Sequence, residues 1–226
     1  MHPYKVVRFG QEGQPLVIFD DFAPAPDAWI DDAAMLSYSR IGVHYPGVRA
    51  EVPPRMKAQF AASVMPVAEA VFGVAAEPGL VESCYSIVTT PPADLTPTQR
   101  LPHFDSTDPN RLALLHYLSP GEEGGTAFYR HRATGFESVS QGRLASYTAA
   151  IDREIAEQGL PDADYIRGST SQFEQIHHVG ARFNRAILYR GNTIHCADIP
   201  SGMALPADPY RGRLTINTFL YCKVAA

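Results

Sequence analysis

The sequence is poor in the features that mark several common classes of protein. Its three cysteines, Cys84, Cys196 and Cys222, are scattered and form no Cys-x-x-Cys pair, so we expect reduced thiols in a cytoplasmic protein. The 19 lysines and arginines are outnumbered by 24 acidic residues, and without a basic excess we expect no nucleic-acid partner. No stretch approaches the roughly 18 apolar residues of a membrane span, and the N-terminus has no apolar segment of the signal-peptide kind.

Common catalytic signatures are missing as well, including the P-loop, Gly-x-Ser-x-Gly and His-Glu-x-x-His. What the chain does have is 45% hydrophobic residues with 11 tyrosines and 11 phenylalanines, a composition that favours strands over helices. At 226 residues one hydrophobic core is sufficient, so we expect a single domain over 1–226. Composition does not decide the oligomeric state, and we leave a homodimer open.

Hydrophobic periodicity predicts helices in the first part of the chain and strands in the second. A helix is expected from Asp27, as its N-cap, to about residue 36, and another over 54–72 with a kink at Pro66. A third helix is expected over 142–158, with Gly159 as its stop. Strands are expected at 5–9, 16–19, 84–88, 112–118, 126–129, 173–179, 185–189 and 213–221, with a turn rich in glycine and glutamate at 119–125. This order indicates an α+β protein, mainly β, with an antiparallel sandwich or barrel as its core.

The segment His103-Phe104-Asp105 is the first candidate for chemistry. In an extended chain, residues i and i+2 point to the same side, so His103 and Asp105 can aim at one point while Phe104 turns into the core. His-x-Asp alone carries little information. A second imidazole at His195, after a turn that follows an apolar strand, would complete two histidines and a carboxylate. That set leaves positions open on ferrous iron for a bidentate co-substrate and O₂.

The last expected strand adds a cation. Arg213 alternates with apolar residues there, so it would project into the barrel, where a buried guanidinium needs an anion and matches a carboxylate bidentately. For a lone arginine, an ion pair with a structural aspartate or glutamate is the more common explanation. Arg211 is a second candidate, but Arg213 directly precedes the apolar alternation.

Two further groups of polar residues have simpler explanations. Glu174, His177 and His178 have the spacing of a di-iron motif, but such motifs come in pairs on helical bundles, and this one lies in a β-like stretch. We expect these side chains to be solvated or hydrogen-bonded. His116 should point away from its neighbour Tyr117 and be a satisfied core or surface histidine.

Taken in order, these motifs resemble the iron(II)- and 2-oxoglutarate-dependent dioxygenases, most closely the prolyl-hydroxylase-like branch and its bacterial relatives. The resemblance covers about 81–224. It is carried by His103-Phe104-Asp105, Tyr117-Leu118 followed by the segment 124–128, the segment 185–189 leading to His195, and the segment 212–217 around Arg213.

The resemblance implies a double-stranded β-helix (jelly roll) core over about 81–224, with N-terminal flanking helices at about 23–73. It implies His103, Asp105 and His195 as ligands of Fe(II), and Arg213 as the partner of the distal carboxylate of 2-oxoglutarate. It also implies that Tyr117 shares this carboxylate and that Tyr85 lines the co-substrate pocket, although both tyrosines also fit as packed strand aromatics. The helical insertion at about 131–172 departs from the simplest family pattern and puts the substrate in doubt.

The function expected from these observations is an oxygenase that uses Fe(II), 2-oxoglutarate and O₂ to hydroxylate a small molecule or a protein side chain, with release of succinate and CO₂. One alternative is a cupin-like metal-binding barrel without oxygenase activity, which would lack the arginine-anchored dicarboxylate. Another is a barrel that has lost its metal and serves only as an interaction module.

Overall fold

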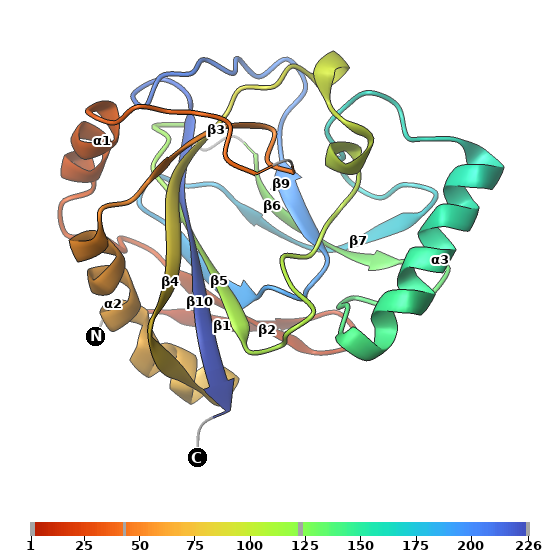
Figure 1. Cartoon of the computed structure of the whole chain (residues 1–226), viewed down its shortest axis with the longest axis horizontal. Helices are drawn as coiled ribbons and strands as arrows, with labels where there is room; N and C mark the ends of the chain where they lie inside the picture. The colour runs from red at the N-terminus through yellow and green to blue at the C-terminus, as the bar shows by residue number, and fades with distance from the viewer. Residues whose placement is uncertain (1–2, 43, 122–123, 225–226) are drawn as a thin grey trace.

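The computed structural model describes residues 3–42, 44–121 and 124–224. These residues form two antiparallel sheets and three α-helices (Figure 1). The large sheet has the strand order β1-β2-β8-β5-β10-β4-β3 and the small sheet the order β7-β6-β9. The strands are β1 (Lys5–Phe9), β2 (Gln14–Phe19), β3 (Gly47–Glu51), β4 (Val74–Val88), β5 (Arg111–Tyr117), β6 (Gly125–His131), β7 (Phe173–Gly180), β8 (Ala186–Arg190), β9 (His195–Asp198) and β10 (Arg213–Val224).

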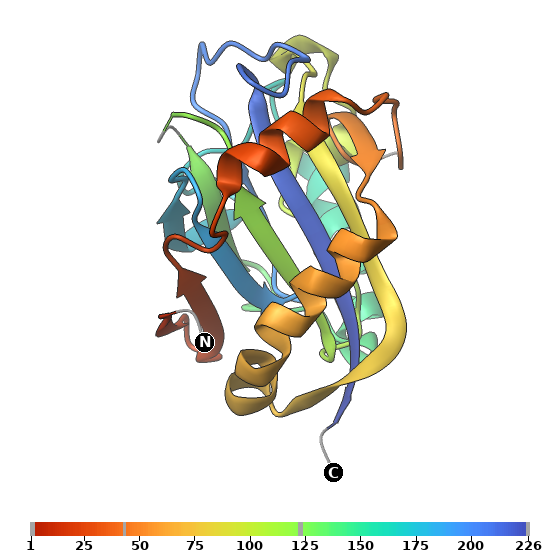
Figure 2. The same cartoon turned by 90° about the vertical axis from the view of Figure 1, so that its left-hand side faces the viewer.

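Two helices, α1 (Pro26–Ala34) and α2 (Pro54–Phe72), cover the outer face of the large sheet (Figure 2). The apolar stripe predicted for the second helix is confirmed, because Phe60, Val64 and Val67 are buried against the sheet. On β10 the outward-facing Leu214, Ile216 and Leu220 belong to the same cluster of buried side chains. The outer face of the large sheet therefore carries the larger hydrophobic core.

The inner face of the large sheet looks toward the small sheet. Phe128 of β6 packs edge-on against Tyr189 of β8, with ring centroids 5.2 Å apart. The same cluster contains Leu115 and Tyr117 of β5 and Val179 of β7. Successive residues of a strand point to opposite faces, so β10 presents its remaining residues, Arg213 among them, to this inner space.

The inserted segment forms the third helix, α3 (Gln141–Gln158), and ends at Gly159 as predicted. It lies at the far side of the molecule from α1 and α2, against the outer face of the small sheet (Figure 1). Its buried Tyr147 packs edge-on against Phe104, with ring centroids 5.9 Å apart. Its Glu154 forms a hydrogen bond with His131 of β6, with 2.9 Å between Oε2 and Nε2. The helical insertion is thus part of the packing around the inner space.

Several local predictions need correction. The first helix begins at Pro26 with Ala25 as its N-cap, so Asp27 lies in the first turn. The strand predicted at 84–88 begins at Val74, and the turn-like stretch after Tyr45 contains the edge strand β3. The proline-rich loop before His103 holds two short 3₁₀ helices, η1 (Pro92–Asp94) and η2 (Pro97–Arg100). Of the turn predicted at 119–125, residues 122–123 lie outside the described residues.

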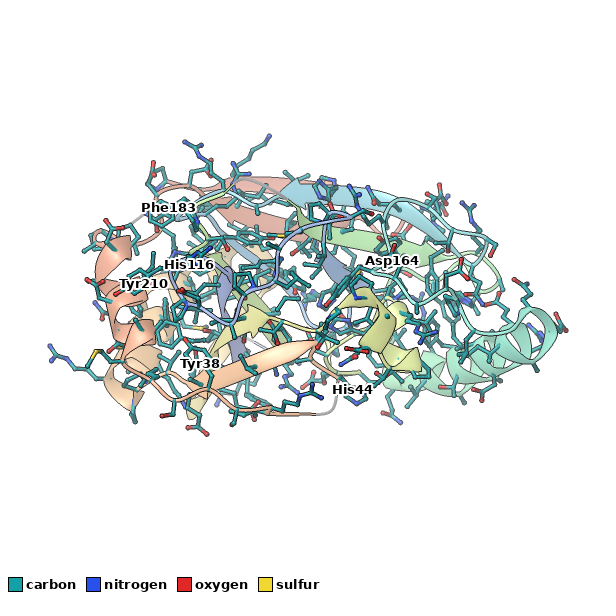
Figure 3. The ribbon with its side chains drawn as sticks, turned by 90° about the horizontal axis from the view of Figure 1, so that it is seen from above. Tyr38, His44, His116, Asp164, Phe183 and Tyr210 are labelled. Atoms are coloured by element: carbon teal, nitrogen blue, oxygen red, sulfur yellow. The ribbon has the colours of Figure 1, made fainter. Side chains whose placement is uncertain are left out.

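No described helix is both long enough and apolar enough to cross a membrane. Seen from above, His116 and Tyr210 lie toward α1, on the opposite side of the molecule from Asp164 (Figure 3). The Tyr210 hydroxyl donates to Asp31 of α1 at 3.0 Å, which ties the loop before β10 to the helical layer.

His116 provides a test of the packing beneath the helices. Its ring is fully buried, contacts Phe22 edge-on and hydrogen-bonds Asn184 at 3.0 Å, and burial lowers its pKa to about 4. Because the unfolded chain binds a proton near the ordinary histidine pKa of about 6.5, stability is full above that pH and falls as the pH drops toward 4, by about 3 kcal/mol in total.

We expect His116→Gln to remove this pH-dependent part of the free energy of unfolding, since glutamine does not titrate in that range. Urea unfolding of both proteins at several pH values between 7 and 4 measures it. Parallel pH profiles for the two proteins would show that His116 is not buried in its neutral form.

Candidate metal centre

The two histidines predicted as metal ligands are joined through their backbones. The amide of His103 donates to the carbonyl of His195 at 2.8 Å, and the amide of His195 donates back to His103 at 2.8 Å. Residues paired in this way across antiparallel strands carry their side chains on the same face. The imidazole rings accordingly lie next to each other, with centroids 4.5 Å apart.

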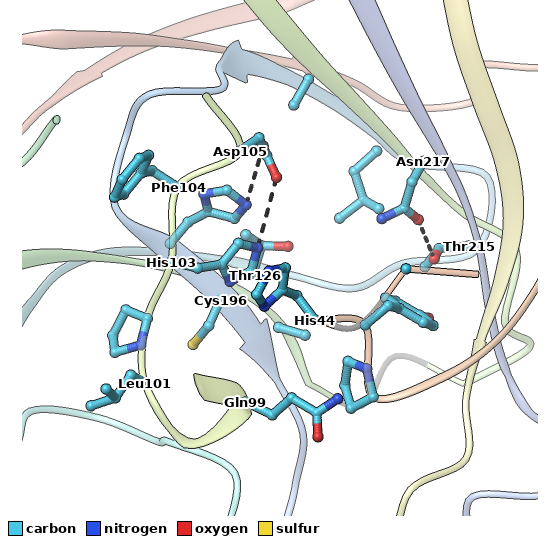
Figure 4. A pocket seen from close by; sticks show the side chains of 18 of the residues that line it. His44, Gln99, Leu101, His103, Phe104, Asp105, Thr126, Cys196, Thr215 and Asn217 are labelled. Atoms are coloured by element: carbon cyan, nitrogen blue, oxygen red, sulfur yellow. Dashed lines mark hydrogen bonds and ion pairs between the residues drawn. The ribbon is translucent and has the colours of Figure 1, made fainter. Parts of the chain in front are cut away.

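Asp105 completes a group of three. Its amide donates to the Gly191 carbonyl at 2.7 Å, which holds the chain extended and returns the carboxylate to the face of the two imidazoles. Asp105 Oδ1 lies 3.8 Å from His103 Nε2, and Oδ2 lies 3.7 Å from His195 Nε2 (Figure 4). Phe104, between the ligands, was predicted to turn into the core, and it packs against Tyr147 of α3.

The donor set fits a divalent metal. One ligand atom from each of these three residues lies within 4.8 Å of the others. His195 Nδ1 is 2.9 Å from the Thr193 carbonyl, so it carries the proton and leaves Nε2 free to coordinate, as in most histidine–metal sites. Asp105 Oδ2 is buried and has no hydrogen-bond partner. A buried carboxylate oxygen without a donor is costly, and a cation at this point would satisfy it.

The electrostatics of the site also suit a metal. The His103 side chain opens into the cavity, with 52% of its surface accessible. Desolvation by the surrounding cavity wall, with the charges of His195, Arg49 and His44, lowers its pKa below the ordinary value. The imidazole is therefore neutral at physiological pH, the form that coordinates a metal. Burial raises the pKa of Asp105, against the opposing charges of His195, Arg111 and Arg49.

Arg213 lies in the same cavity as these ligands. The cavity has a volume of about 490 Å³, within the usual range for a small-molecule site. Arg213 is only 4% exposed, its Nη2 donates to the Gly125 carbonyl at 3.0 Å, and its Nε is buried without a hydrogen-bond partner. No aspartate or glutamate in the described part of the chain forms an ion pair with it. The described residues therefore do not provide the common explanation for a lone arginine, a structural ion pair.

The glycine that meets Arg213 is required by its surroundings. A Cβ on Gly125 would lie 2.1 Å from the carbonyl oxygen of Val179, and its φ of 154° is one that side chains rarely adopt. Only glycine allows β6 to begin here with its carbonyl directed at the guanidinium. This explains the Gly124-Gly125 pair in the sequence.

The structure separates the two tyrosines that were expected beside Arg213. Tyr117 is buried near Arg213, with its ring centroid 6.0 Å from the guanidinium carbon, but its hydroxyl is engaged with Thr126 at 2.7 Å. Thr126, rather than Tyr117, lines the cavity. The expectation that Tyr85 lines the cavity is wrong: Tyr85 pairs with Ile216, faces the helices, and donates its hydroxyl to Asp32 of α1 at 3.0 Å.

Three residues that were not predicted as site residues also line the cavity, namely Tyr45, Arg49 and Tyr165. The Tyr45 hydroxyl is buried without a hydrogen-bond partner. Burial raises the pKa of Tyr45, and the charges of Arg213 and Arg49 oppose that rise. Tyr165, from the insertion, donates its hydroxyl to the Thr90 carbonyl at 2.8 Å and packs near Tyr45. The local signal in the sequence is the segment 44–49, which reads as a turn with an aromatic residue and a charge. Such a turn can contact a substrate but is more often simply packed, so it did not single out Tyr45 or Arg49.

The remaining polar candidates have structural roles, as predicted. Glu174 pairs with Arg130 at 2.7 Å, His178 with Asp198 at 3.0 Å, and the His177 ring stacks on Phe9. Among the described residues, the group of His103, Asp105 and His195 is the only candidate metal site. Arg211 is exposed, which leaves Arg213 as the cation of the cavity next to β10.

Sequence comparison places the chain in a family. Residues 2–220 match the family of unknown function DUF6445. The chain belongs to that family. No curated protein matches it.

Solved structures show a weaker likeness to this DUF6445 chain. A prolyl-4-hydroxylase from Pseudomonas putida is 14% identical, with a TM-score of 0.49 over 93% of this chain and 94% of that one. An N-substituted L-amino acid dioxygenase from Burkholderia ambifaria is 14% identical, with a TM-score of 0.46 over 100% and 95%. HygX from Streptomyces hygroscopicus, solved with nickel and 2-oxoglutarate bound, is 11% identical, with a TM-score of 0.45 over 92% and 84%. At these scores, function has to be inferred from the residues of the site itself.

Metal binding is tested by thermal unfolding under anaerobic conditions with Fe(II), or with Ni(II) as a redox-stable substitute. At a free metal concentration of 100 times Kd, we expect about 2.7 kcal/mol of stabilisation. Asp105→Ala should abolish it. Asp198→Ala is the matched control, because Asp198 binds His178 and Arg167 outside the metal group, and it should keep the full shift. Equal shifts in both variants would place the metal elsewhere.

Proposed function

We propose that this protein is an Fe(II)- and 2-oxoglutarate-dependent oxygenase that hydroxylates a small molecule or a protein side chain and releases succinate and CO₂. The observation that carries the proposal is Arg213, a buried guanidinium that pairs with no acidic side chain of the described residues, in the cavity that also holds His103, Asp105 and His195. A metal site alone is common to many activities. A metal site with an unpaired buried arginine in the same cavity indicates a ligand that is both a chelator and a carboxylate.

His103, Asp105 and His195 would hold the metal on one face. Ferrous iron bound by two histidines and one carboxylate keeps positions open for a 2-oxo acid and for O₂, and supports oxidative decarboxylation of the acid coupled to hydroxylation of the substrate. The oxygen atoms of O₂ are divided between succinate and the hydroxylated product. The two facing antiparallel sheets are the arrangement that a double-stranded β-helix would require.

The residues around Arg213 would orient the distal carboxylate of 2-oxoglutarate. Arg213 supplies charge and a fork of donors. The Thr126 hydroxyl lines the cavity and is held in place by Tyr117, so Tyr117 would position the second donor. Tyr45 and Tyr165 pack around the same end with Val88 and Leu95, which excludes water and strengthens the ion pair.

The cupin-like alternative predicts a metal site whose arginine is turned outward or paired with a protein carboxylate. Arg213 is buried rather than turned outward, and no aspartate or glutamate within residues 3–42, 44–121 and 124–224 pairs with it. The alternative of an interaction module without a metal predicts a degraded ligand set, whereas all three ligand side chains face one another here. Both observations favour the oxygenase.

Anaerobic titration of the Fe(II)-loaded protein with 2-oxoglutarate tests the proposal, followed through the visible charge-transfer band of an iron–2-oxo acid chelate. We expect a saturable band in the wild type. Arg213→Met should raise Kd by about 30- to 700-fold, because losing one partner of a buried charge pair costs about 2–4 kcal/mol. Arg211→Met is the control, since Arg211 is exposed two positions earlier, and it should bind normally.

Arg213→Lys should retain part of the affinity, because lysine keeps the charge without the fork of donors. Iron binding without a charge-transfer band would support the cupin-like alternative. An equal loss of affinity in the Arg211 and Arg213 variants would show that the distal carboxylate is bound elsewhere.

A further inference from the structure

A second arginine faces the same cavity. Arg49 lies on β3 and pairs with Ser86 of β4, which in turn pairs with Thr215 of β10. Residues directly opposite one another across strands share a face of the sheet, so Arg49 is on the inner face together with Arg213. It lies two strands nearer the sheet edge, about 10 Å along the sheet at roughly 4.8 Å per strand.

Arg49, like Arg213, lacks an anionic partner in the part of the chain that the structure describes. Its Nε is buried without a hydrogen-bond partner, and none of the described residues forms an ion pair with it. Its guanidinium carbon lies 4.1 Å from the centroid of the Tyr45 ring. Stacking on an aromatic ring fixes the plane of a guanidinium and leaves its edge free for bidentate acceptors. The positive charge of Arg49 lowers the pKa of both His103 and Asp105. An anion bound to Arg49 would therefore lie near the metal ligands.

Arg49 and Arg213 are held apart by the sheet, because β3 and β10 are separated by β4. Arg49 stacks on the Tyr45 ring. The cavity therefore offers two separate positions for an anion, here called subsites. Arg213, at 4% exposed, lies in the closed subsite. Arg49 is only partly buried, and its Nη1 lies 4.0 Å from where a Cβ on Gly42 would stand, at the loop that borders the cavity.

Charge balance identifies what the open subsite binds. A divalent metal and Arg213 are neutralised by Asp105 and the dianion 2-oxoglutarate. The third arginine of the cavity wall, Arg111, already pairs with Glu82 at 3.3 Å. Arg49 then remains as one uncompensated positive charge, and an unpaired charge in a partly buried site is costly. A single carboxylate cancels it, whereas a phosphate monoester, with a charge of about −1.5 to −2, would overcompensate.

The acidic residues of the cavity limit the substrate further. Among the described residues that line it, Asp105 is the only acidic one, and it belongs to the metal group. A free ammonium group would therefore have no carboxylate to pair with. The wall also includes the apolar side chains of Leu101, Ile151 and Ile166, which suit an apolar substrate body.

We propose that Arg49 recognises the carboxylate of the primary substrate, which is a small monocarboxylate with an apolar body and no free ammonium group. This inference rests on the proposed function of the same cavity. It predicts that Arg49 discriminates between a carboxylic acid and its primary amide, which have nearly the same shape but differ in charge.

The test uses the Ni(II)-loaded, 2-oxoglutarate-saturated protein and a panel of N-acetyl amino acids with apolar side chains, each paired with its primary amide. Binding is measured by thermal shift and calorimetry. For at least one pair we expect the acid to bind wild type at least tenfold more tightly than the amide. Arg49→Gln should abolish that preference, and Arg49→Lys should keep part of it. Arg153→Gln, an exposed position on α3, is the control and should leave it unchanged.

The outcomes separate this inference from the proposed function. If 2-oxoglutarate does not bind the metal-loaded wild type, the proposed function fails before Arg49 is tested. If 2-oxoglutarate binds and no acid is preferred over its amide, the inference about Arg49 is wrong and the oxygenase proposal stands. The inference about Arg49 is also overturned if Arg49→Gln still prefers the acid over its amide. It is overturned as well if Arg49→Gln loses as much affinity for 2-oxoglutarate as Arg213→Met does, because Arg49 would then bind the co-substrate.

Discussion

The reciprocal backbone hydrogen bonds between His103 and His195 are the constraint on which the candidate site depends. They join a loop that leaves the proline-rich segment to the first residue of β9. An antiparallel pair that exchanges both of its hydrogen bonds holds the two Cα atoms about 5.5 Å apart with the side chains on one face. Asp105 is held in turn by Gly191, so the positions of all three ligands are set by backbone pairing. The metal group is therefore prepared by the fold before any ion binds.

The last strand divides the protein into a stabilising side and a functional side. The outward residues Leu214, Ile216 and Leu220 of β10 are apolar and join the core beneath α1 and α2. The inward residues Arg213, Thr215 and Asn217 are polar and line the cavity. Burying polar groups costs free energy unless they find partners. Thr215 donates to Asn217 at 2.8 Å, whereas Arg213 Nε has no partner. The apolar outer face offsets this cost and allows the inner face to remain polar.

Much of this arrangement was predictable from local patterns. Alternation placed Arg213 on the inner face, and the i, i+2 relation brought His103 and Asp105 together, because both depend only on the geometry of a single strand. The second and third helices followed from apolar stripes with clear ends. Tyr85 was misplaced for a different reason. Its face is set by its pairing with Ile216, and the register between strands is not contained in either strand alone.

The same limit explains why Arg49 and Tyr45 were missed as site residues. The segment Gly47–Glu51 has a glycine and two charged residues, a composition that is depleted in strands. It becomes a strand because the edge of β4 offers it unpaired backbone groups. A Cβ on Gly47 would lie 2.0 Å from the Ile87 carbonyl oxygen, so glycine is needed for that close pairing. The residue that weakens the local strand signal is thus the residue that makes the pairing feasible.

Two arginines in one cavity that pair with none of the described acidic residues are costly for the unliganded fold. Replacing a buried charge with an apolar side chain of similar size is often neutral or stabilising, so a sequence selected for stability alone would not keep both. Anions that bind only the folded state stabilise it, and this offsets the cost of the two unpaired arginines. Because the two arginines lie two strands apart on the inner face of the sheet, each anion would relieve mainly its own arginine. Substrate and co-substrate would then each contribute separately to the stability of the complex, because the co-substrate would balance the charges of the metal and Arg213 and the substrate would balance that of Arg49.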